Sequence, residues 1–235
     1  MIIFPAIDIK DNKCVRLEQG NFNKLTSYSE NPLEVAKQWE AQGAEYIHIV
    51  DLDGAKSQSD KNFKTIETII NSVNIKLQLG GGIRSIQSAE TLLNMGIDRI
   101  ILGTAAVKNP LLLDDLSEKF CSRIAVSIDA IDGRVAVDGW QEISESNILS
   151  ICRYMELKGI KTLICTDISK DGMLSGPNFE LYKDLKANTN LDIIASGGIA
   201  TLSDIKKLKT LDIYGTIVGK ALYEGIFKLE EALKC

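Results

Sequence analysis

Histidine is almost missing from this chain, which has one, His48, among 235 residues. A metal site with several histidine ligands is therefore excluded, and we expect no bound metal. No apolar run approaches the length of a membrane span, and Met1 leads into a strand-like segment without a basic leader. We therefore expect neither a membrane contact nor a signal peptide.

The cysteines and the charge exclude further classes of protein. The five cysteines are an odd number without any CxxC spacing, which, with no secretory signal, indicates free thiols in a reducing cytoplasm. The formal net charge of −5 argues against a nucleic-acid-binding protein. The composition, 45% hydrophobic and 25% charged, is that of a globular protein, and the length suits one large domain or two small ones.

The sequence contains many short apolar runs that are rich in β-branched residues. Eight of them are strand candidates, and most are apolar throughout, which is typical of parallel strands buried on both faces. They lie at residues 2–8, 45–51, 75–80, 99–103, 123–129, 161–167, 192–197 and 214–219.

Helix signals lie between these runs. Asn31 followed by Pro32 predicts an N-cap and a first helical residue, and that helix is expected to end at Gly43. Asn109 and Pro110 repeat the signal. Eight strands alternating with helices predict a (β/α)8 TIM barrel of the α/β class, with an open, doubly wound sheet as the alternative. Apolar residues at helical spacing predict two further helices, through Ile86, Ala89 and Leu93 and through Ile148, Ile151 and Met155.

An internal repeat favours the barrel. AID at 6–8 matches SID at 127–129, and chance similarity among glycine-ended strands is the alternative explanation. We predict a single domain, residues 1–235, built from two duplicated (β/α)4 halves at about 1–120 and 121–235. Three more segments recur at an offset of 116 residues: QLGGGIRS at 78–85 as IASGGIAT at 194–201, ILGTA at 101–105 as IVGKA at 217–221, and HIVD at 48–51 as ICTD at 164–167.

Glycines follow several predicted strands where the chain turns into a helix. Glycine lets the backbone approach a ligand, and the free N–H groups of a helix N-terminus favour an anion such as phosphate. TIM-barrel enzymes often bind phosphate after strands 7 and 8, and the repeat predicts a second site after strands 3 and 4, hence a substrate with a phosphate at each end. Tight turns alone are the alternative. The predicted residues are Gly197, Gly198, Gly219 and Lys220 in one site and Gly81, Gly82, Gly103 and Thr104 in the other.

Two aspartates are paired by the repeat. Asp8 and Asp129 end predicted strands 1 and 5, which lie opposite each other in an eight-stranded barrel, at the face that carries the active sites of this fold. Two carboxylates facing each other across a substrate can serve as a general acid and a general base. An N-cap or a group that positions a loop is the alternative for either one.

The repeat also predicts which side chains face the barrel interior. Side chains alternate along a strand, so His48 and Asp51 point to opposite faces. An inward-facing Thr166 would place His48 inward as well and send Asp51 and Asp167 outward or into the loops. His48 is then either a polar group beside the substrate or a hydrogen-bonded core group.

Two long loops are expected at the barrel mouth, where such loops often act as lids. The first, residues 9–31, carries Arg16, and the second, residues 130–143, carries Trp140 between glycine-rich turns. Trp140 would either stack on a planar heterocycle or anchor the packing of the lid. The other tryptophan, Trp39, falls in the first helix and is expected in the core.

These segments together resemble a known family over essentially the whole chain. The motifs are PAIDIKDNKCVRLEQG, HIVDLDGA, LGGGIRS, ILGTAAVKNP, SIDAIDGRVAVDGWQE, TDISKDGMLSGPN and SGGIA. They resemble the phosphoribosylformimino-aminoimidazole carboxamide ribotide isomerases of histidine biosynthesis, the HisA family. The resemblance implies a half-barrel-duplicated TIM barrel, no metal or organic cofactor, a small bisphosphorylated substrate, and an Amadori rearrangement of an aminoaldose to an aminoketose.

Roles for single residues follow from the resemblance only. It implies that Asp8, ionised near neutral pH, removes the proton from C2 of the opened ribose, and that Asp129 is the acid that assists ring opening. Thr166 and Asp171 would support the reacting sugar. The glycine loops named above would bind the phosphates, and further contacts to substrate would come from Arg16, Arg84 and Trp140.

Alternatives stay open within and beyond this family. Asn12 stands where the family usually has glycine, which we expect to affect loop conformation and not chemistry. The sister cyclase shares the barrel and the aspartate pair, but IKDNKCVRL after strand 1 and the VAVDGW hairpin after strand 5 are isomerase features. A dual-specificity isomerase that also accepts phosphoribosylanthranilate and a non-catalytic sugar-phosphate-binding barrel remain as well. Two carboxylates facing an anionic ligand favour catalysis, and we expect a monomer.

Overall fold

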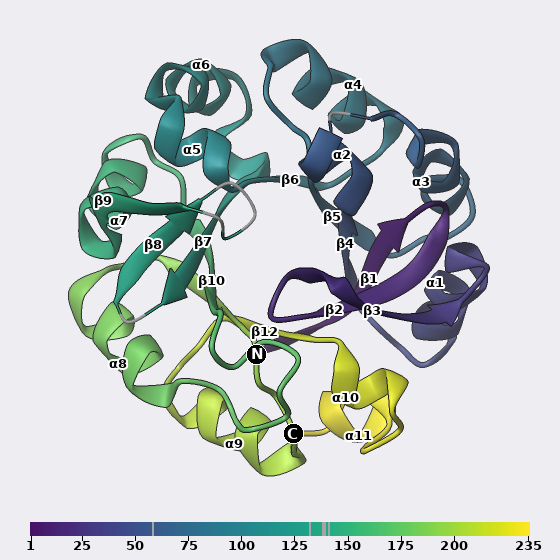
Figure 1. The fold of residues 1–235 in the computed structure, drawn as a ribbon. Coiled ribbons are helices and arrows are strands. Elements are labelled where there is room, and N and C mark those ends of the chain that lie inside the picture. Colours follow the sequence, from purple (N-terminus) through teal and green to yellow (C-terminus); the bar gives the residue numbers. More distant parts are fainter. Residues whose placement is uncertain (58, 132, 138–139, 141) are drawn as a thin grey trace.

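A closed barrel of eight parallel strands is the centre of this computed structural model, and helices surround it (Figure 1). The structure describes residues 1–57, 59–131, 133–137, 140 and 142–235. The barrel strands are β1 (Ile2–Lys10), β4 (Tyr46–Asp51), β5 (Lys76–Gly80), β6 (Arg99–Leu102), β7 (Ile124–Ile131), β10 (Thr162–Asp167), β11 (Asp192–Ser196) and β12 (Gly215–Val218).

Closure of this sheet decides between the two predicted folds. β1 pairs in parallel with both β12 and β4, and β7 pairs with both β6 and β10. The strands therefore form a circle, a (β/α)8 TIM barrel, and the open-sheet alternative is wrong. All eight predicted strands are confirmed to within two residues at either end.

Helices cover the outside of the barrel, and their caps follow the sequence signals. Asn31 and Asn109 accept hydrogen bonds from Leu33 N and Leu112 N, which confirms both predicted N-caps. The helices are α1 (Pro32–Ala41), α2 (Leu52–Ser57), α3 (Phe63–Ile70), α4 (Ile86–Met95), α5 (Thr104–Lys108), α6 (Pro110–Phe120), α7 (Ile148–Leu157), α8 (Phe179–Asn188), α9 (Leu202–Thr210), α10 (Lys220–Tyr223) and α11 (Leu229–Leu233), with a short 3-10 turn at Cys121–Arg123. None of the described helices is long and apolar enough to cross a membrane.

The prediction of a long loop after β1 is wrong, and the segment after β7 contains the hairpin that the family resemblance indicated. Each segment is an antiparallel hairpin, with β2 (Lys13–Glu18) and β3 (Asn21–Ser29) after β1 and with β8 (Arg134–Val137) and β9 (Glu142–Asn147) after β7. β1 and β7 run two residues past Asp8 and Asp129 and continue into these hairpins. The hairpin strands are stabilised by backbone pairing with the extended ends of β1 and β7. The composition of the two segments does not reveal this pairing.

The first hairpin turns at Asp11 and Asn12, and both residues have positive φ, of 52° and 62°. Two such residues between paired positions Lys10 and Lys13 make the tight turn that suits the twist of a β-hairpin. Asparagine tolerates this conformation better than most residues that carry a side chain. Asn12 is therefore compatible with this turn, and its expected effect on loop conformation stays a prediction.

Apolar side chains of the described residues form three separate clusters. The largest lies between the strands and the helices, where Trp39 is buried as predicted. The second fills the lower barrel interior with Phe4, Tyr46, Ile101, Ile164 and others, packed between opposite strands. The third and smallest packs β2 against α2. Because the second cluster, an apolar plug, closes the barrel at its N-terminal end, polar side chains higher up face only the mouth.

Two aspartates confirm the predicted parity by pointing away from the barrel interior. Asp51 accepts a hydrogen bond from Asn62 Nδ2 at 2.7 Å, and Asp167 accepts one from Asn178 Nδ2 at 2.6 Å. The two pairs stand 116 positions apart, as in the sequence repeat. Both tie the end of a barrel strand to the residue that precedes a later helix, α3 or α8. This correspondence supports the duplicated halves, which remain a prediction.

Replacement of Asn62 by alanine is expected to lower the free energy of unfolding by about 2–4 kcal/mol, measured by urea denaturation. Asn62 is fully buried; its Nδ2 donates to Asp51, and its Oδ1 accepts from Asn12 N. The truncation leaves buried polar groups without partners. Asn74→Ala, at an exposed position, is the control and should change stability by less than about 0.5 kcal/mol. Equal effects would contradict the assigned role of Asn62.

Candidate active site

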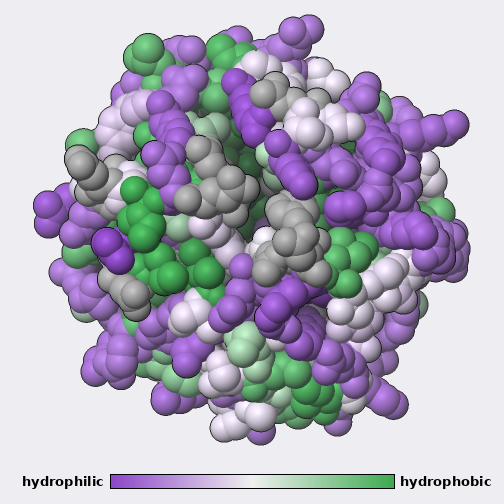
Figure 2. Space-filling model, in the orientation of Figure 1, coloured by the Kyte–Doolittle hydropathy of each residue, from purple (hydrophilic) through white to green (hydrophobic). Residues whose placement is uncertain are grey.

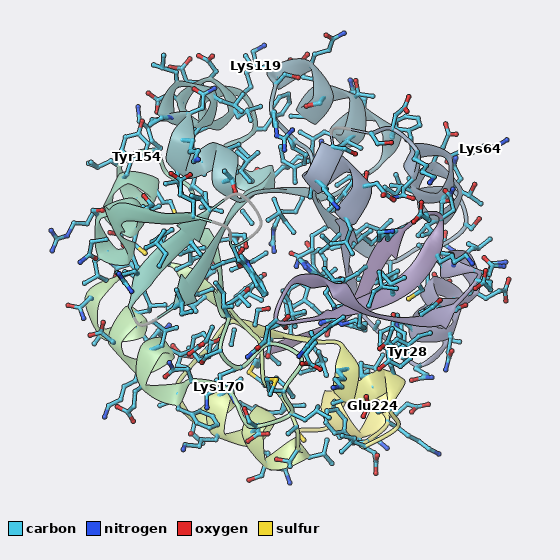
Figure 3. The ribbon with its side chains drawn as sticks, viewed as in Figure 1. Tyr28, Lys64, Lys119, Tyr154, Lys170 and Glu224 are labelled. Carbon is cyan, nitrogen blue, oxygen red and sulfur yellow. The ribbon has the colours of Figure 1, made fainter. Side chains whose placement is uncertain are left out.

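A cavity of about 490 Å³ opens at the carboxyl ends of the barrel strands. Figure 2 shows the molecule from this mouth, and Figure 3 shows side chains from the barrel strands and both hairpins converging there. Twelve of the sixteen predicted site residues line it, namely Asp8, Arg16, His48, Gly81, Gly82, Arg84, Gly103, Thr104, Asp129, Trp140, Thr166 and Asp171.

Asp8 lies within a strand and is not an N-cap. It pairs in register with Val15 of the hairpin on one side and with Val50 of β4 on the other. The side chain accepts a hydrogen bond from Arg16 Nη1 at 2.8 Å. Burial raises the pKa of Asp8 from 3.8 to about 6, against the opposing effect of Arg16. Asp8 is therefore mostly ionised at neutral pH and can take up a proton readily.

Asp129 lies on the opposite side of the barrel, since three barrel strands separate β1 from β7 in either direction. Its Oδ2 accepts a hydrogen bond from Trp140 Nε1 at 2.7 Å, and the Thr166 side chain also bonds to it. Burial raises the pKa of Asp129 to about 6 as well, although both donors lower it. The two carboxyl groups thus have similar proton affinities but different partners, an arginine for Asp8 and two neutral donors for Asp129.

Arg16 joins several groups at the mouth. Besides Asp8, it faces the Asp171 carboxylate at 3.8 Å. Its guanidinium passes so close to Gly219 that a Cβ there would lie 2.6 Å from Arg16 Cζ. Position 219 therefore needs glycine to leave space for the Arg16 side chain. This structural reason for glycine is independent of the predicted contact with phosphate.

The four remaining predicted residues, Gly197, Gly198, Gly219 and Lys220, line a neighbouring cavity of about 20 Å³. A volume of this size holds about one water molecule. Lys220 Nζ donates to Gly172 O at 2.9 Å across it. The predicted phosphate site with Gly81, Gly82, Gly103 and Thr104 thus opens into the large cavity. The other predicted phosphate site is too small for a phosphate unless Lys220 or Arg16 shifts.

The first glycine pair also has a packing reason. A Cβ on Gly81, whose φ is +106°, would lie 2.2 Å from Asp51 O, and Gly197 approaches Asp167 O in the same manner. Residues at these positions must be glycine for the strand ends to pack. A structural reason, of the kind that the alternative of tight turns proposed, and the predicted contact with phosphate therefore apply to the same residues.

The two hairpins meet over the mouth. The Trp140 ring lies against Gly20, where a Cβ would come within 2.3 Å of Trp140 Cε3. On its outer side the first hairpin is held by Tyr28, which stacks on Tyr223 at 4.8 Å and donates to Glu224 Oε1 at 3.2 Å (Figure 3). Trp140 therefore serves as a packing anchor in this structure, and its stacking on a heterocycle stays a prediction.

Three polar residues in or next to the cavity were not predicted from the sequence. Ser127 lines the cavity, Gln78 bonds to His48, and Arg99 bonds to Gln78. Strand parity could have found Gln78, because it is the polar residue of IKLQLG that pairs in register with His48. The described residues contain no cluster of three or more histidine, cysteine, aspartate or glutamate side chains suited to a metal ion.

The raised pKa of Asp129 predicts a stability effect. Below pH 3.8 the carboxyl group is protonated in folded and unfolded chains alike; as the pH rises to about 6 the unfolded chain loses its proton first, and folding becomes less favourable. Asp129→Asn removes this loss and should raise the free energy of unfolding at pH 8 by about 1–3 kcal/mol. The gain should vanish near pH 4 in urea titrations, whereas the exposed control Asp115→Asn should show no such pH dependence.

The comparisons with known proteins agree with this geometry. A family described as "Histidine biosynthesis protein" matches residues 2–228. A 1-(5-phosphoribosyl)-5-((5-phosphoribosylamino)methylideneamino) imidazole-4-carboxamide isomerase of Clostridioides difficile is 51% identical, over 99% of this chain and 97% of its own. Isomerases of the same name from Oceanobacillus iheyensis and Acetivibrio thermocellus are 49% and 48% identical, over all of this chain and 98% and 99% of theirs. The chain belongs to the histidine biosynthesis protein family.

Proposed function

We propose that this chain isomerises N-(5-phosphoribosylformimino)-5-aminoimidazole-4-carboxamide ribotide, a bisphosphorylated aminoaldose, to the corresponding aminoketose in histidine biosynthesis. The observation that carries the proposal is the pair of carboxyl groups on opposite barrel strands, Asp8 and Asp129, each with a pKa raised to about 6 at the bottom of one cavity. General acid–base catalysis is most effective when the pKa lies near the working pH.

The reaction begins with ring opening. Asp129 gives its proton to the ribose ring oxygen as the C1–O bond breaks, and the amino nitrogen lone pair forms the C1=N bond of a protonated imine. Trp140 and Thr166, which donate to the Asp129 carboxylate, stabilise the negative charge that remains after transfer. The opened sugar is then extended across the cavity.

Proton transfer from carbon follows. Asp8 takes the C2 proton, and the electrons of the C–H bond form the C1=C2 bond of an enolamine while the imine nitrogen becomes neutral. The enol then tautomerises, placing a proton on C1 and a ketone at C2. Arg16 keeps Asp8 ionised despite its burial, so the base is available at the start of each turnover.

The substrate is held at both ends in this proposal. Gly81, Gly82, Gly103 and Thr104, with Arg84 above them, would bind one phosphate in the large cavity. Gly197, Gly198, Gly219 and Lys220 would bind the other once the small cavity widens. His48 and Asp171 would contact the sugar, since both line the space between.

The setting of the enzyme completes the proposal. We place it in the cytoplasm as a monomer without a cofactor, acting on a small molecule and binding neither nucleic acid nor membranes. Five free cysteines are consistent with a reducing compartment, and one chain supplies every residue assigned to the site. The domain is proposed to comprise all 235 residues.

Purified protein is expected to convert the aminoaldose to the ketose, followed by absorbance in an assay coupled to the cyclase of the next step. Asp8→Asn should lower kcat by about 10²–10⁴-fold because the base is lost, while the exposed Asp115→Asn control retains full activity. Wild-type protein that binds the substrate without turnover would favour a sugar-phosphate sensor. Turnover of phosphoribosylanthranilate by the same preparation would identify dual specificity.

The pH profile tests the two roles separately. Because both carboxyl groups have a pKa of about 6, kcat/KM is expected to peak near pH 6, falling below it as Asp8 becomes protonated and above it as Asp129 loses its proton. Arg16→Gln removes the cation that lowers the pKa of Asp8, so it should move the acidic limb to higher pH. A limb that stays in place would assign the titration to the substrate phosphates instead of Asp8.

A further inference from the structure

A chain of three polar side chains runs along one side of the barrel interior, at and below the floor of the cavity. His48, Gln78 and Arg99 lie on the neighbouring strands β4, β5 and β6 and pair in register, so their side chains share the interior face. Their exposed fractions are 9%, 0% and 8%. Polar groups at this depth require partners, and these three supply one another.

The orientation of the Gln78 amide follows from donor chemistry. Arg99 Nη1 donates to Gln78 Oε1 at 3.2 Å, and a guanidinium has hydrogen-bond donors only. A flipped amide would set its NH2 group against these donors, at the cost of a buried bond. Gln78 therefore directs its oxygen to Arg99 and its NH2 group to the imidazole.

The same reasoning fixes the imidazole. Gln78 Nε2 lies 3.0 Å from His48 Nδ1, and an amide NH2 group can only donate. Nδ1 must then carry the lone pair, so the proton of the neutral ring lies on Nε2. Burial and the nearby Arg16 charge lower the pKa of His48 to about 3, which keeps the ring neutral across the physiological range.

Arg99 is itself held from the barrel floor. Its guanidinium lies over the Tyr46 ring, with Cζ 5.3 Å from the ring centroid, and Tyr46 packs on Phe4 at 5.2 Å. A cation above an aromatic face is stabilised when removed from water. The apolar plug therefore anchors the end of the polar chain.

The other end of the chain reaches the cavity. His48 lines the mouth together with Asp8. Within the described residues, the Gln78 bond is the one that the imidazole makes to the protein, and Nε2 is not among the buried atoms without a partner. Nε2–H is accordingly available to a molecule in the cavity.

We propose that Gln78 and Arg99 are positioning residues that hold His48 as its Nε2–H tautomer, so that the ring presents a hydrogen-bond donor to an oxygen of the reacting sugar. The role toward the sugar rests on the proposed isomerase function, whereas the tautomer does not. The reversed tautomer would direct a lone pair at the substrate oxygen and lose this contact. A neutral donor also leaves the charge balance around Asp8 unchanged.

The tautomer can be measured directly because His48 is the single histidine. The full-length, untagged chain is labelled with 15N, and long-range 1H–15N correlation spectra distinguish a protonated nitrogen from one with a lone pair. We expect a lone pair at Nδ1 and a proton on Nε2, unchanged between about pH 5 and pH 8. A protonated Nδ1, an averaged signal or an imidazolium at pH 7 would overturn the proposal.

Three variants test the two positioning residues. Gln78→Glu replaces the donor with an acceptor and should move the proton to Nδ1 or charge the ring, whereas Arg99→Met frees the amide and should give a tautomer mixture. Arg99→Lys keeps a donor and should retain the Nε2–H form. An unchanged spectrum in Gln78→Glu would refute the role of Gln78. If a variant fails to fold, the wild-type spectrum still decides which tautomer is present.

Kinetics test the link to the substrate. Gln78→Glu should lower kcat/KM by about 10–100-fold, and in a His48→Asn background the same change should have no further effect. Additive losses would show that Gln78 acts by another route. Wild-type protein with the Nε2–H tautomer but no isomerase activity would refute the proposed function and leave the tautomer assignment standing.

Discussion

The parallel pairing that closes β12 onto β1 and β10 onto β7 is the constraint on which the remaining structure depends. Closure places strands 1 and 5 opposite each other and directs the carboxyl ends of all eight strands to one mouth. It also removes every edge at which the inner strands could be solvated. The barrel interior therefore has two layers, an apolar cluster at the N-terminal end and a polar, partly open layer above it. The proposed active site lies directly above the apolar cluster.

Much of this arrangement was predictable because it depends on local patterns. Continuous apolar runs marked the eight barrel strands, Asn-Pro pairs marked two helix starts, and the repeat paired Asp8 with Asp129. The hairpin after β1 was missed because its strands are stabilised by pairing with the extension of β1, a tertiary effect that composition does not record, whereas the hairpin after β7 was indicated by the family resemblance alone. The closed state of the cavity beside Gly219 was equally hidden, because it depends on the path of the Arg16 side chain from a distant strand.

Burial raises the pKa of both carboxyl groups of the proposed active site, and it has a cost. Asp8 and Asp129 are less stable as anions than they would be in water, and each retains a pKa near neutrality for that reason. The partners differ in kind: a cation beside Asp8 restores some stability to the charged form, whereas neutral donors hold Asp129. This asymmetry between two repeat-related carboxylates allows one to serve as base and the other as acid.

The continuity of β1 and β7 into their hairpins has a mechanical consequence. Asp8 and Asp129 each lie on a continuous strand. Its first part belongs to the barrel and its last residues pair with the hairpin, without a break between them. If the proposed substrate moves either hairpin, the movement reaches the backbone of Asp8 or Asp129 along a continuous strand. Binding at the mouth would then alter the position of the proposed base or acid without an intervening element.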